Sequence, residues 1–257
     1  MSLNGLLERA GGSPARLLLA GGDAAPLRRA AARLTAAGLQ SVQVVGDGGI
    51  GTSEHPRLES VATLLRSRAP ERVRDAIDAL DLAADPLRFA LGLCALGEAD
   101  AVVAGPEIGT TALVEATIWT LGPPPETGSF RFAAWLLLPD GRLVAFADCA
   151  PAEPLDSGGQ QRLGAQVARL HARLTQEQPR IALLPGFRGD ENVLIFPGGT
   201  SGSFALRIAK GLAGARLLGP LLLGSSGIVA GVAPDADEEE LVGTAAATVL
   251  VAAGAGP

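Results

Sequence analysis

The sequence predicts an α/β fold, with a mainly parallel sheet and helices on both faces. Short apolar runs at 16–20, 42–45 and 101–104 have the length of buried strands. Helical stretches of roughly 10–15 residues separate strands of this kind, and such alternation is typical of a parallel sheet. Hydrophobic residues make up 47% of the chain and aromatic residues only 4%, so we expect a core of mainly Ala, Leu and Val. With 257 residues, the chain can form one α/β domain or two smaller ones.

Composition argues against several classes of function. A net charge of -6 and a pI near 5.0 disfavour nucleic-acid binding, which needs clustered basic residues. We expect no membrane contact and a cytoplasmic location, because no long uncharged apolar span and no signal-like start occur. Cys94 and Cys149 lie in apolar segments and are expected to be reduced, packed thiols. With only two histidines, His55 and His171, neither a metal site nor a serine–histidine triad is expected, and no covalently bound cofactor.

The first half of the chain reads as alternating helices and strands. Asp23 is placed to cap a helix that Gly38 ends, and Pro86 starts another that runs to Leu96. Residues 58–82 read as one helix with a basic middle. The loop 46–51 matches G-x-G-x-x-G after a strand, but no helix opens from its last glycine, so a surface loop is favoured over a dinucleotide site.

The next segments predict a hairpin and two further helices. Residues 119–128 are rich in proline and predict a crossing between domains. Asp140-Gly141 predicts a hairpin turn between strands at 130–138 and 143–147. Helices are expected at 160–176 and at 238–253, the latter with acidic residues in its first turn.

The stretch 191–224 carries the main candidate site. Its strand at 193–196 is followed by a small-residue loop, 198–203, and then by a helix with Phe204, Ile208 and Leu212 on one face. Free N–H groups at a helix start favour anions, and Ser201 or Ser203 could cap the helix or contact a phosphate. An ordinary strand-to-helix turn is the alternative. Thr110 and Thr111, at another helix start, are likewise either caps or phosphate contacts.

Three segments resemble the phosphate acetyl/butyryl transferase family: Asn192 to Gly224, Leu96 to Thr111, and Leu137 to Ala150. The resemblance implies a three-layer α/β/α fold of the two-domain isocitrate/isopropylmalate dehydrogenase type, with a reduced second domain. The first domain would comprise 1–128 and 219–257, and the second 129–218. The resemblance also implies acyl transfer between acyl-coenzyme A and phosphate. The implied partners are small molecules, acyl-coenzyme A or acyl phosphate, and the implied assembly is a homodimer. The residues expected in the phosphate and coenzyme A cleft are Arg66, Thr110, Thr111, Gly199, Thr200, Ser201, Gly202, Ser203 and Arg207.

The sequence also departs from the family pattern. A serine–arginine pair that finishes the cleft in relatives falls on Ala233 and Pro234, and a further family arginine falls on Glu115. The acidic residue that follows is retained as Glu240, and no general base is assigned. A central segment of relatives is missing where the chain passes from Leu184 to Asn192. These departures keep a second hypothesis open: an inactive relative that binds a phosphorylated metabolite, coenzyme A or a partner subunit.

Overall fold

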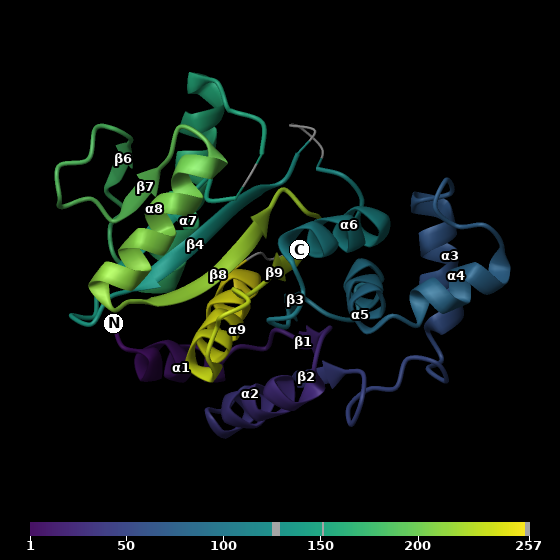
Figure 1. Cartoon of the computed structure of the whole chain (residues 1–257). Helices are drawn as coiled ribbons and strands as arrows, with labels where there is room; N and C mark the ends of the chain where they lie inside the picture. The colour runs from purple at the N-terminus through teal and green to yellow at the C-terminus, as the bar shows by residue number, and fades with distance from the viewer. Residues whose placement is uncertain (125–128, 151, 255–257) are drawn as a thin grey trace.

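The computed structural model describes residues 1–124, 129–150 and 152–254. Within them, one nine-stranded sheet has helices on both faces, as Figure 1 shows. The strand order is β2-β1-β3-β9-β8-β4-β5-β7-β6. Parallel pairing joins β2-β1-β3-β9 and β5-β7-β6, whereas β8 and β4 connect the two parts by antiparallel pairing. The predicted α/β class with a mainly parallel sheet is therefore confirmed.

The strands are short apart from the two central ones. Their bounds are β1 (Leu17–Ala20), β2 (Val42–Val45), β3 (Ala101–Ala104), β4 (Arg131–Leu137), β5 (Leu143–Ala147), β6 (Ile181–Leu183), β7 (Val193–Ile195), β8 (Arg216–Leu223) and β9 (Ile228–Ala230). The helices are α1 (Leu3–Gly11), α2 (Ala24–Ala36), α3 (Leu58–Arg68), α4 (Ala76–Ala83), α5 (Pro86–Ala95), α6 (Thr110–Leu121), α7 (Ser157–Thr175), α8 (Gly199–Ala213) and α9 (Glu238–Ala253).

Two apolar cores lie on opposite faces of the sheet. Helices α1, α2, α7 and α9 cover one face, with Leu27 and Val242 among the core side chains. Helices α5 and α8 contact the other face, and α3, α4 and α6 pack on α5 in the same core, which includes Leu206. Neighbouring side chains of β4 point to opposite faces, as strand geometry requires: Trp135 lies in the first core and Leu136 in the second. The molecule thus has the three-layer α/β/α arrangement.

Local capping explains where several helices begin. The Asp23 carboxylate accepts from the N–H of Ala25 at the start of α2, and Asp237 accepts from Glu240 at the start of α9. Pro86 is the first residue of α5, directly after the cap Asp85. These starts, and the end of α9 at Ala253, agree with the sequence-based boundaries.

The prediction of a single helix over 58–82 is wrong. Helix α3 ends at Arg68, and α4 begins only at Ala76. Pro70 disfavours helical geometry at the residue before it and supplies no N–H donor, so the helix cannot continue through this point. Asp75 then starts α4 by accepting from the N–H groups of Ile77 and Asp78.

Two other sequence predictions can be compared directly with the structure. The hairpin at Asp140-Gly141 is confirmed, since Leu137 pairs with Leu143 in antiparallel β4 and β5. The crossing predicted at 119–128 begins inside α6, which runs to Leu121, and residues 125–128 lie outside the described residues. No helix in the described part of the chain combines the length and apolarity needed to cross a bilayer.

Candidate functional site

A cleft of about 780 Å³ opens at the carboxyl ends of β3, β5 and β9. Ligand sites of α/β sheets form at these strand ends, because loops and helix starts converge there. Its lining joins segments far apart in the sequence: the start of α6, Cys149 and Ala150 shortly after β5, one face of α8, β8, and the loop after β9. The lining side chains used below are Thr110, Leu113, Phe132, Cys149, Ala150, Ser203, Leu206, Arg207, Lys210, Leu217, Ala233, Pro234 and Asp235.

One face of α8 supplies the polar side of the cleft. Ser203, Arg207 and Lys210 are three and four residues apart, so they lie on one side of the helix. Leu206, between them in sequence, packs into the core beneath. The helix therefore presents a hydroxyl, a guanidinium and an ammonium to the same hollow.

A glycine lets the start of α8 lie close to the end of β5. A Cβ on Gly202 would be 2.3 Å from the backbone oxygen of Asp148, a distance that no side chain tolerates. Asp148 itself has a positive φ of 58°, uncommon for a residue other than glycine. The close approach of the backbone at Gly202 to the backbone at Asp148 fixes the position of α8 beside the cleft wall, which Cys149 and Ala150 form.

The sequence-based view of this turn needs two corrections. Residues 199–203 were expected in a loop, but α8 already begins at Gly199, because the close packing of Gly202 on the Asp148 backbone overrides the low helix propensity of glycine. Of the two roles left open for Ser201 and Ser203, the capping role is wrong, because Gly198 is the N-cap and no side chain caps this helix. Ser201 Oγ instead donates to the Gly198 carbonyl oxygen, at 2.7 Å. The anion expected at this helix start stays a prediction.

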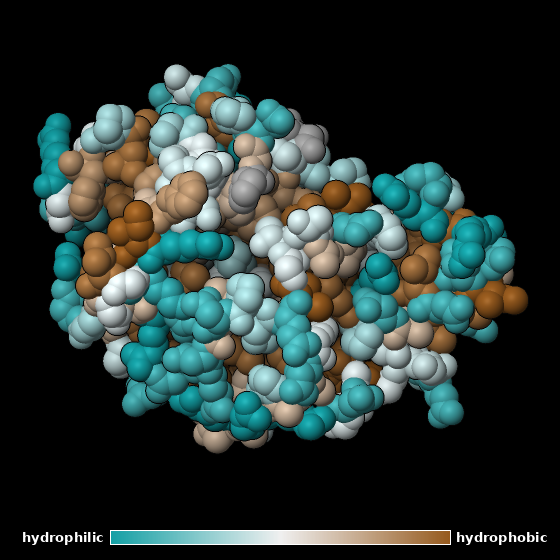
Figure 2. Space-filling view, viewed as in Figure 1, coloured by the Kyte–Doolittle hydropathy of each residue, from teal (hydrophilic) through white to brown (hydrophobic). Residues whose placement is uncertain are grey.

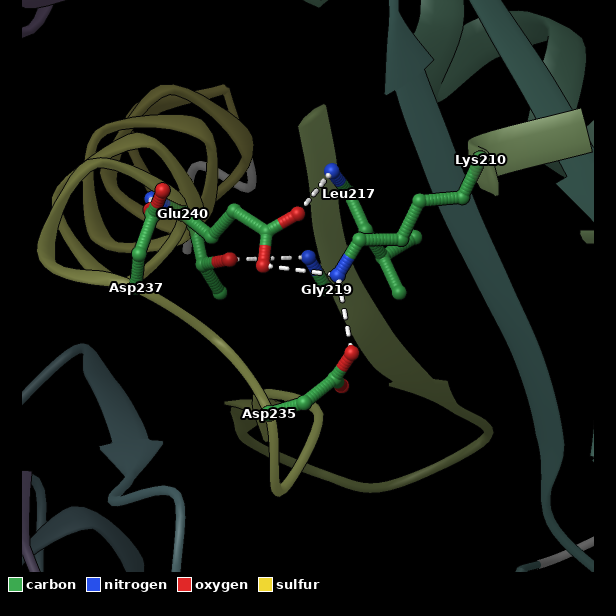
Figure 3. Close-up of polar contacts among 7 residues, drawn as sticks. Lys210, Leu217, Gly219, Asp235, Asp237 and Glu240 are labelled. Atoms are coloured by element: carbon green, nitrogen blue, oxygen red, sulfur yellow. Dashed lines mark hydrogen bonds and ion pairs between the residues drawn. The ribbon is translucent and has the colours of Figure 1, made fainter. Parts of the chain in front are cut away.

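Lys210 is held in a charged network that joins α8 to α9. Its Nζ lies 2.9 Å from Glu240 Oε2 and 3.4 Å from Asp235 Oδ2, as Figure 3 shows. The other oxygen of Glu240 accepts from the N–H of Leu217, at 2.7 Å, so both carboxylate oxygens are engaged. Glu240 is only 4% exposed, whereas the side chain of Asp235 is 78% exposed. Desolvation lowers the pKa of Lys210, but hydrogen bonding and the charges of Glu240 and Asp235 outweigh it, so the pKa is raised and the ammonium stays charged.

A second ion pair lies buried behind the cleft floor. Arg131 Nη1 is 3.3 Å from Asp148 Oδ1, and both side chains are almost fully buried. Burial raises the pKa of Asp148, and the nearby guanidinium opposes this rise. Cys149 is buried as expected for a packed thiol: desolvation raises its pKa to about 12, which disfavours the nucleophilic thiolate.

The structure brings together some of the residues expected in the cleft. Thr110, Ser203 and Arg207 line it. Arg66 is an exposed residue of α3, away from this lining. The lining likewise does not include Thr111, Gly199, Thr200, Ser201 or Gly202. Glu115 is exposed on α6 and is not a lining residue either.

Sequence reasoning missed Lys210 and Asp235. A signal for Lys210 was available, because it is the only lysine of the chain and follows Ser203 and Arg207 at helical spacing. Asp235 enters the cleft only through the fold of the loop after β9, which no local pattern reveals.

A second hollow, of about 680 Å³, lies beside the loop 46–51. Its charged lining is mostly acidic, with Asp23, Asp47 and Glu54 against a single cation, Arg28. Arg28 Nη1 already donates to the Asp47 carbonyl oxygen, at 2.6 Å. The next helix after this loop, α3, begins only at Leu58, so the loop lacks the helix start that a dinucleotide site requires. The cleft is therefore the better candidate for an anionic ligand. In the described residues, no cluster of His, Cys, Asp and Glu suited to a metal ion occurs.

A family model described as "Phosphate acetyl/butaryl transferase" matches residues 1–185 and 186–249. The chain belongs to this family. A curated phosphate acetyltransferase from Paracoccus denitrificans is 26% identical over 272 residues, covering 81% of this chain and 86% of the relative. Family membership supports a phosphate acyltransferase type of function.

Solved structures of phosphotransacetylases share the fold. The EutD phosphotransacetylase from Staphylococcus aureus superposes with a TM-score of 0.80 at 17% identity, covering 97% of this chain and 98% of the other. A phosphotransacetylase from Streptococcus pyogenes gives a TM-score of 0.79 at 18% identity, covering 98% and 99%. The two matched stretches of the family model meet at Pro185 and Gly186, in the connection between β6 and β7 where the sequence analysis placed the missing segment.

Proposed function

We propose that this chain transfers an acyl group between coenzyme A and orthophosphate. The observation that carries the proposal is the cleft itself, which joins Thr110, Ser203, Arg207 and Lys210 at the carboxyl ends of the strands in a member of this family. Cations are needed there to balance the phosphate charge, and hydroxyl donors to polarise the acyl carbonyl oxygen. The apolar side of the same cleft, with Leu113, Phe132 and Leu206, suits the acyl chain.

In the proposed reaction, orthophosphate attacks the thioester carbonyl carbon and the thiolate of coenzyme A leaves. Arg207 would hold the phosphate, and Thr110 or Ser203 would donate to the oxygen that becomes negative. The thiolate must then gain a proton, and no residue is assigned to this step. Glu240, which aligns with the family acid, has both oxygens engaged by Lys210 and Leu217.

The rival proposal is an inactive relative that binds a phosphorylated metabolite, coenzyme A or a partner subunit. A specific observation favours it: Ala233 and Pro234 line the cleft where the family pattern has serine and arginine. Neither side chain can donate a hydrogen bond or carry a charge. The cleft is thus complete as a cavity but has lost two groups that relatives use.

The assay that separates the two proposals is release of free thiol from acetyl-coenzyme A, or from longer acyl-coenzyme A esters, in the presence of phosphate. Turnover that Arg207→Met lowers by roughly tenfold or more supports the transferase, because a charge-assisted contact to phosphate is lost. Folded protein with no turnover for any acyl chain contradicts it.

A second experiment restores the missing groups. Ala233→Ser with Pro234→Arg places a hydroxyl and a guanidinium back in the cleft. The rival proposal expects this double variant to gain phosphate affinity, measured by calorimetry. Glu115→Gln is the matched control, because it makes the same one-unit change in net charge at an exposed position outside the lining. An equal gain from Glu115→Gln would show that net charge alone is responsible.

We further propose a homodimer that forms through the outer face of α8. Phe204, Ile208 and Leu212, expected on one helix face, do share one, but it points to solvent with exposures of 63%, 59% and 86%. Figure 2 shows apolar side chains gathered over α8. A single apolar stripe of this kind can pair with its own copy about a two-fold axis.

The proposed domains are 1–128 with 219–257, and 129–218. This division cuts β8, whose antiparallel pairing with β4 and β9 joins the two halves of the sheet. The cleft lies at this junction, since its lining takes residues from both proposed domains. The cytoplasmic location stays a prediction from the sequence.

A further inference from the structure

Lys210 stands out in this chain on two independent grounds. It is the only lysine, against 21 lysine and arginine residues in total. It also lines the cleft, on the same helix face as Ser203 and Arg207. Every other basic position has the always-charged, forked guanidinium, and this one has a compact ammonium.

The ammonium reaches the part of the cleft where the family arginine is absent. Its Nζ is 3.4 Å from a carboxylate oxygen of Asp235, the residue that directly follows Pro234. The positive charge therefore lies beside the 233–235 segment, although it comes from α8 on the opposite wall (Figure 3). A phosphate group lying against Ala233 and Pro234 would therefore form an ion pair with the Lys210 ammonium.

The network around Lys210 leaves room for a ligand. A lysine ammonium has three N–H donors, and Glu240 and Asp235 accept from Lys210 Nζ. Glu240 is buried and fixed by the N–H of Leu217, so it holds Lys210 in place. Asp235 is mostly exposed, and an ion pair of that kind contributes little, so a phosphate can displace it.

We propose that Lys210 binds the phosphate group together with Arg207, taking the place of the absent family arginine, and that Glu240 is the positioning residue that orients Lys210. This inference rests on the proposed function for its setting, but its test measures binding rather than turnover. The phosphate group can come from orthophosphate or acyl phosphate, or from the phosphorylated nucleotide end of coenzyme A.

The single lysine gives a direct measurement. Protein labelled with ¹³Cε-lysine should show one lysine signal by NMR, because the chain has one lysine. Titration with inorganic phosphate should shift this signal with saturation. A shift produced instead by adenosine 3′,5′-bisphosphate identifies the coenzyme as the source of the phosphate group. A signal that neither compound moves overturns the proposal.

Variants add a second, independent readout. Lys210→Met should weaken phosphate binding by roughly tenfold or more, and Lys210→Arg should retain much of it because the charge is kept. Lys210→Met leaves Glu240 buried without its partner, so Lys210→Met with Glu240→Gln is made in parallel to keep the fold intact. Arg216→Met is the control, because Arg216 pairs with Glu239 at the start of α9 but does not line the cleft.

The outcomes separate this inference from the proposed function. Phosphate-dependent shifts without turnover would contradict the transferase and keep the Lys210 site. Turnover with an unmoved lysine signal would keep the transferase and overturn the role of Lys210. Equal phosphate affinity in the wild type and in the folded double variant would also overturn it.

Discussion

Helices α8 and α9 are linked by the ion pair between Lys210 and Glu240 but are held in place by different means. Helix α9 is buried along most of its length, packed among β8, α1 and α2 (Figure 1). Helix α8 packs one side on the sheet and leaves an apolar stripe in solvent. A carboxylate caps α9, whereas no side chain caps α8.

The difference shows how a peripheral helix can be placed accurately. Hydrophobic burial on several sides fixes α9 without any single essential contact. Helix α8 has fewer such contacts, so a few specific ones matter more: the backbone approach at Gly202 and the ion pair from Lys210 to Glu240. The functional groups of the cleft therefore lie on the helix whose position depends on specific contacts.

The largest expected effect comes from removing the link between the two helices. Glu240→Ala leaves the buried N–H of Leu217 without an acceptor and the Lys210 ammonium with only the exposed Asp235 carboxylate, so the free energy of unfolding should fall by about 3–4 kcal/mol. Urea unfolding measures the change. Glu239→Ala is the control, because its pair with Arg216 is partly exposed and should contribute less than about 1 kcal/mol. Equal losses would show that the buried link has no special role.

Measuring the free energy of unfolding as a function of pH tests helix α7, which packs beside α9. His171, in α7, is fully buried, and burial lowers its pKa to about 4. The unfolded chain binds a proton near its ordinary pKa of 6.5, so stability should be full above pH 6.5 and fall as the pH drops toward 4. The full loss is on the order of 3 kcal/mol, since the two pKa values differ by about 2.5 and each pKa unit is worth about 1.4 kcal/mol. His171→Leu should make the free energy of unfolding nearly independent of pH between about 4 and 6.5. An unchanged slope would show that carboxylates, and not His171, cause the pH dependence.

Gly202→Ala tests the backbone approach that positions α8. Its Cβ would lie 2.3 Å from the Asp148 oxygen, so the helix must shift, at a cost of about 1–3 kcal/mol in unfolding free energy. Phosphate binding in the cleft should weaken as well, because Arg207 and Lys210 move with the helix. Gly211→Ala is the control for stability on the same helix, since its Cβ meets no atom within 4 Å; it is not a control for binding, because Gly211 lines the cleft. Identical results for both glycines would contradict the special role of Gly202.

The smallest effect on stability is expected at the exposed stripe of α8. Leu212→Glu should change the unfolding free energy of the protomer by less than about 0.5 kcal/mol, because this side chain is 86% exposed. Light scattering should nevertheless report a lower mass than for the wild type if the stripe forms the dimer. A wild-type protein that is monomeric across a wide concentration range contradicts the dimer.

The sequence predicted much of the scaffold and part of the site. Strand runs, the hairpin at Asp140-Gly141 and the start of α5 at Pro86 follow from local preferences, which act between near neighbours. The periodicity of α8 was visible, but a pattern of Phe204, Ile208 and Leu212 does not say which face meets the sheet. That assignment was decided by Gly202 and Leu206, which pack inward.

By itself the sequence determined the α/β class, most element boundaries and the family, because these depend on alternating patterns and on motifs that stay contiguous in the chain. Tertiary structure alone decided which groups share the cleft. It placed Lys210 beside Asp235 and Glu240, 25 and 30 residues away, and left Arg66 outside the lining. The physical reason is that strand order and helix packing set the distances between charges, and these distances are not encoded in any local stretch of sequence.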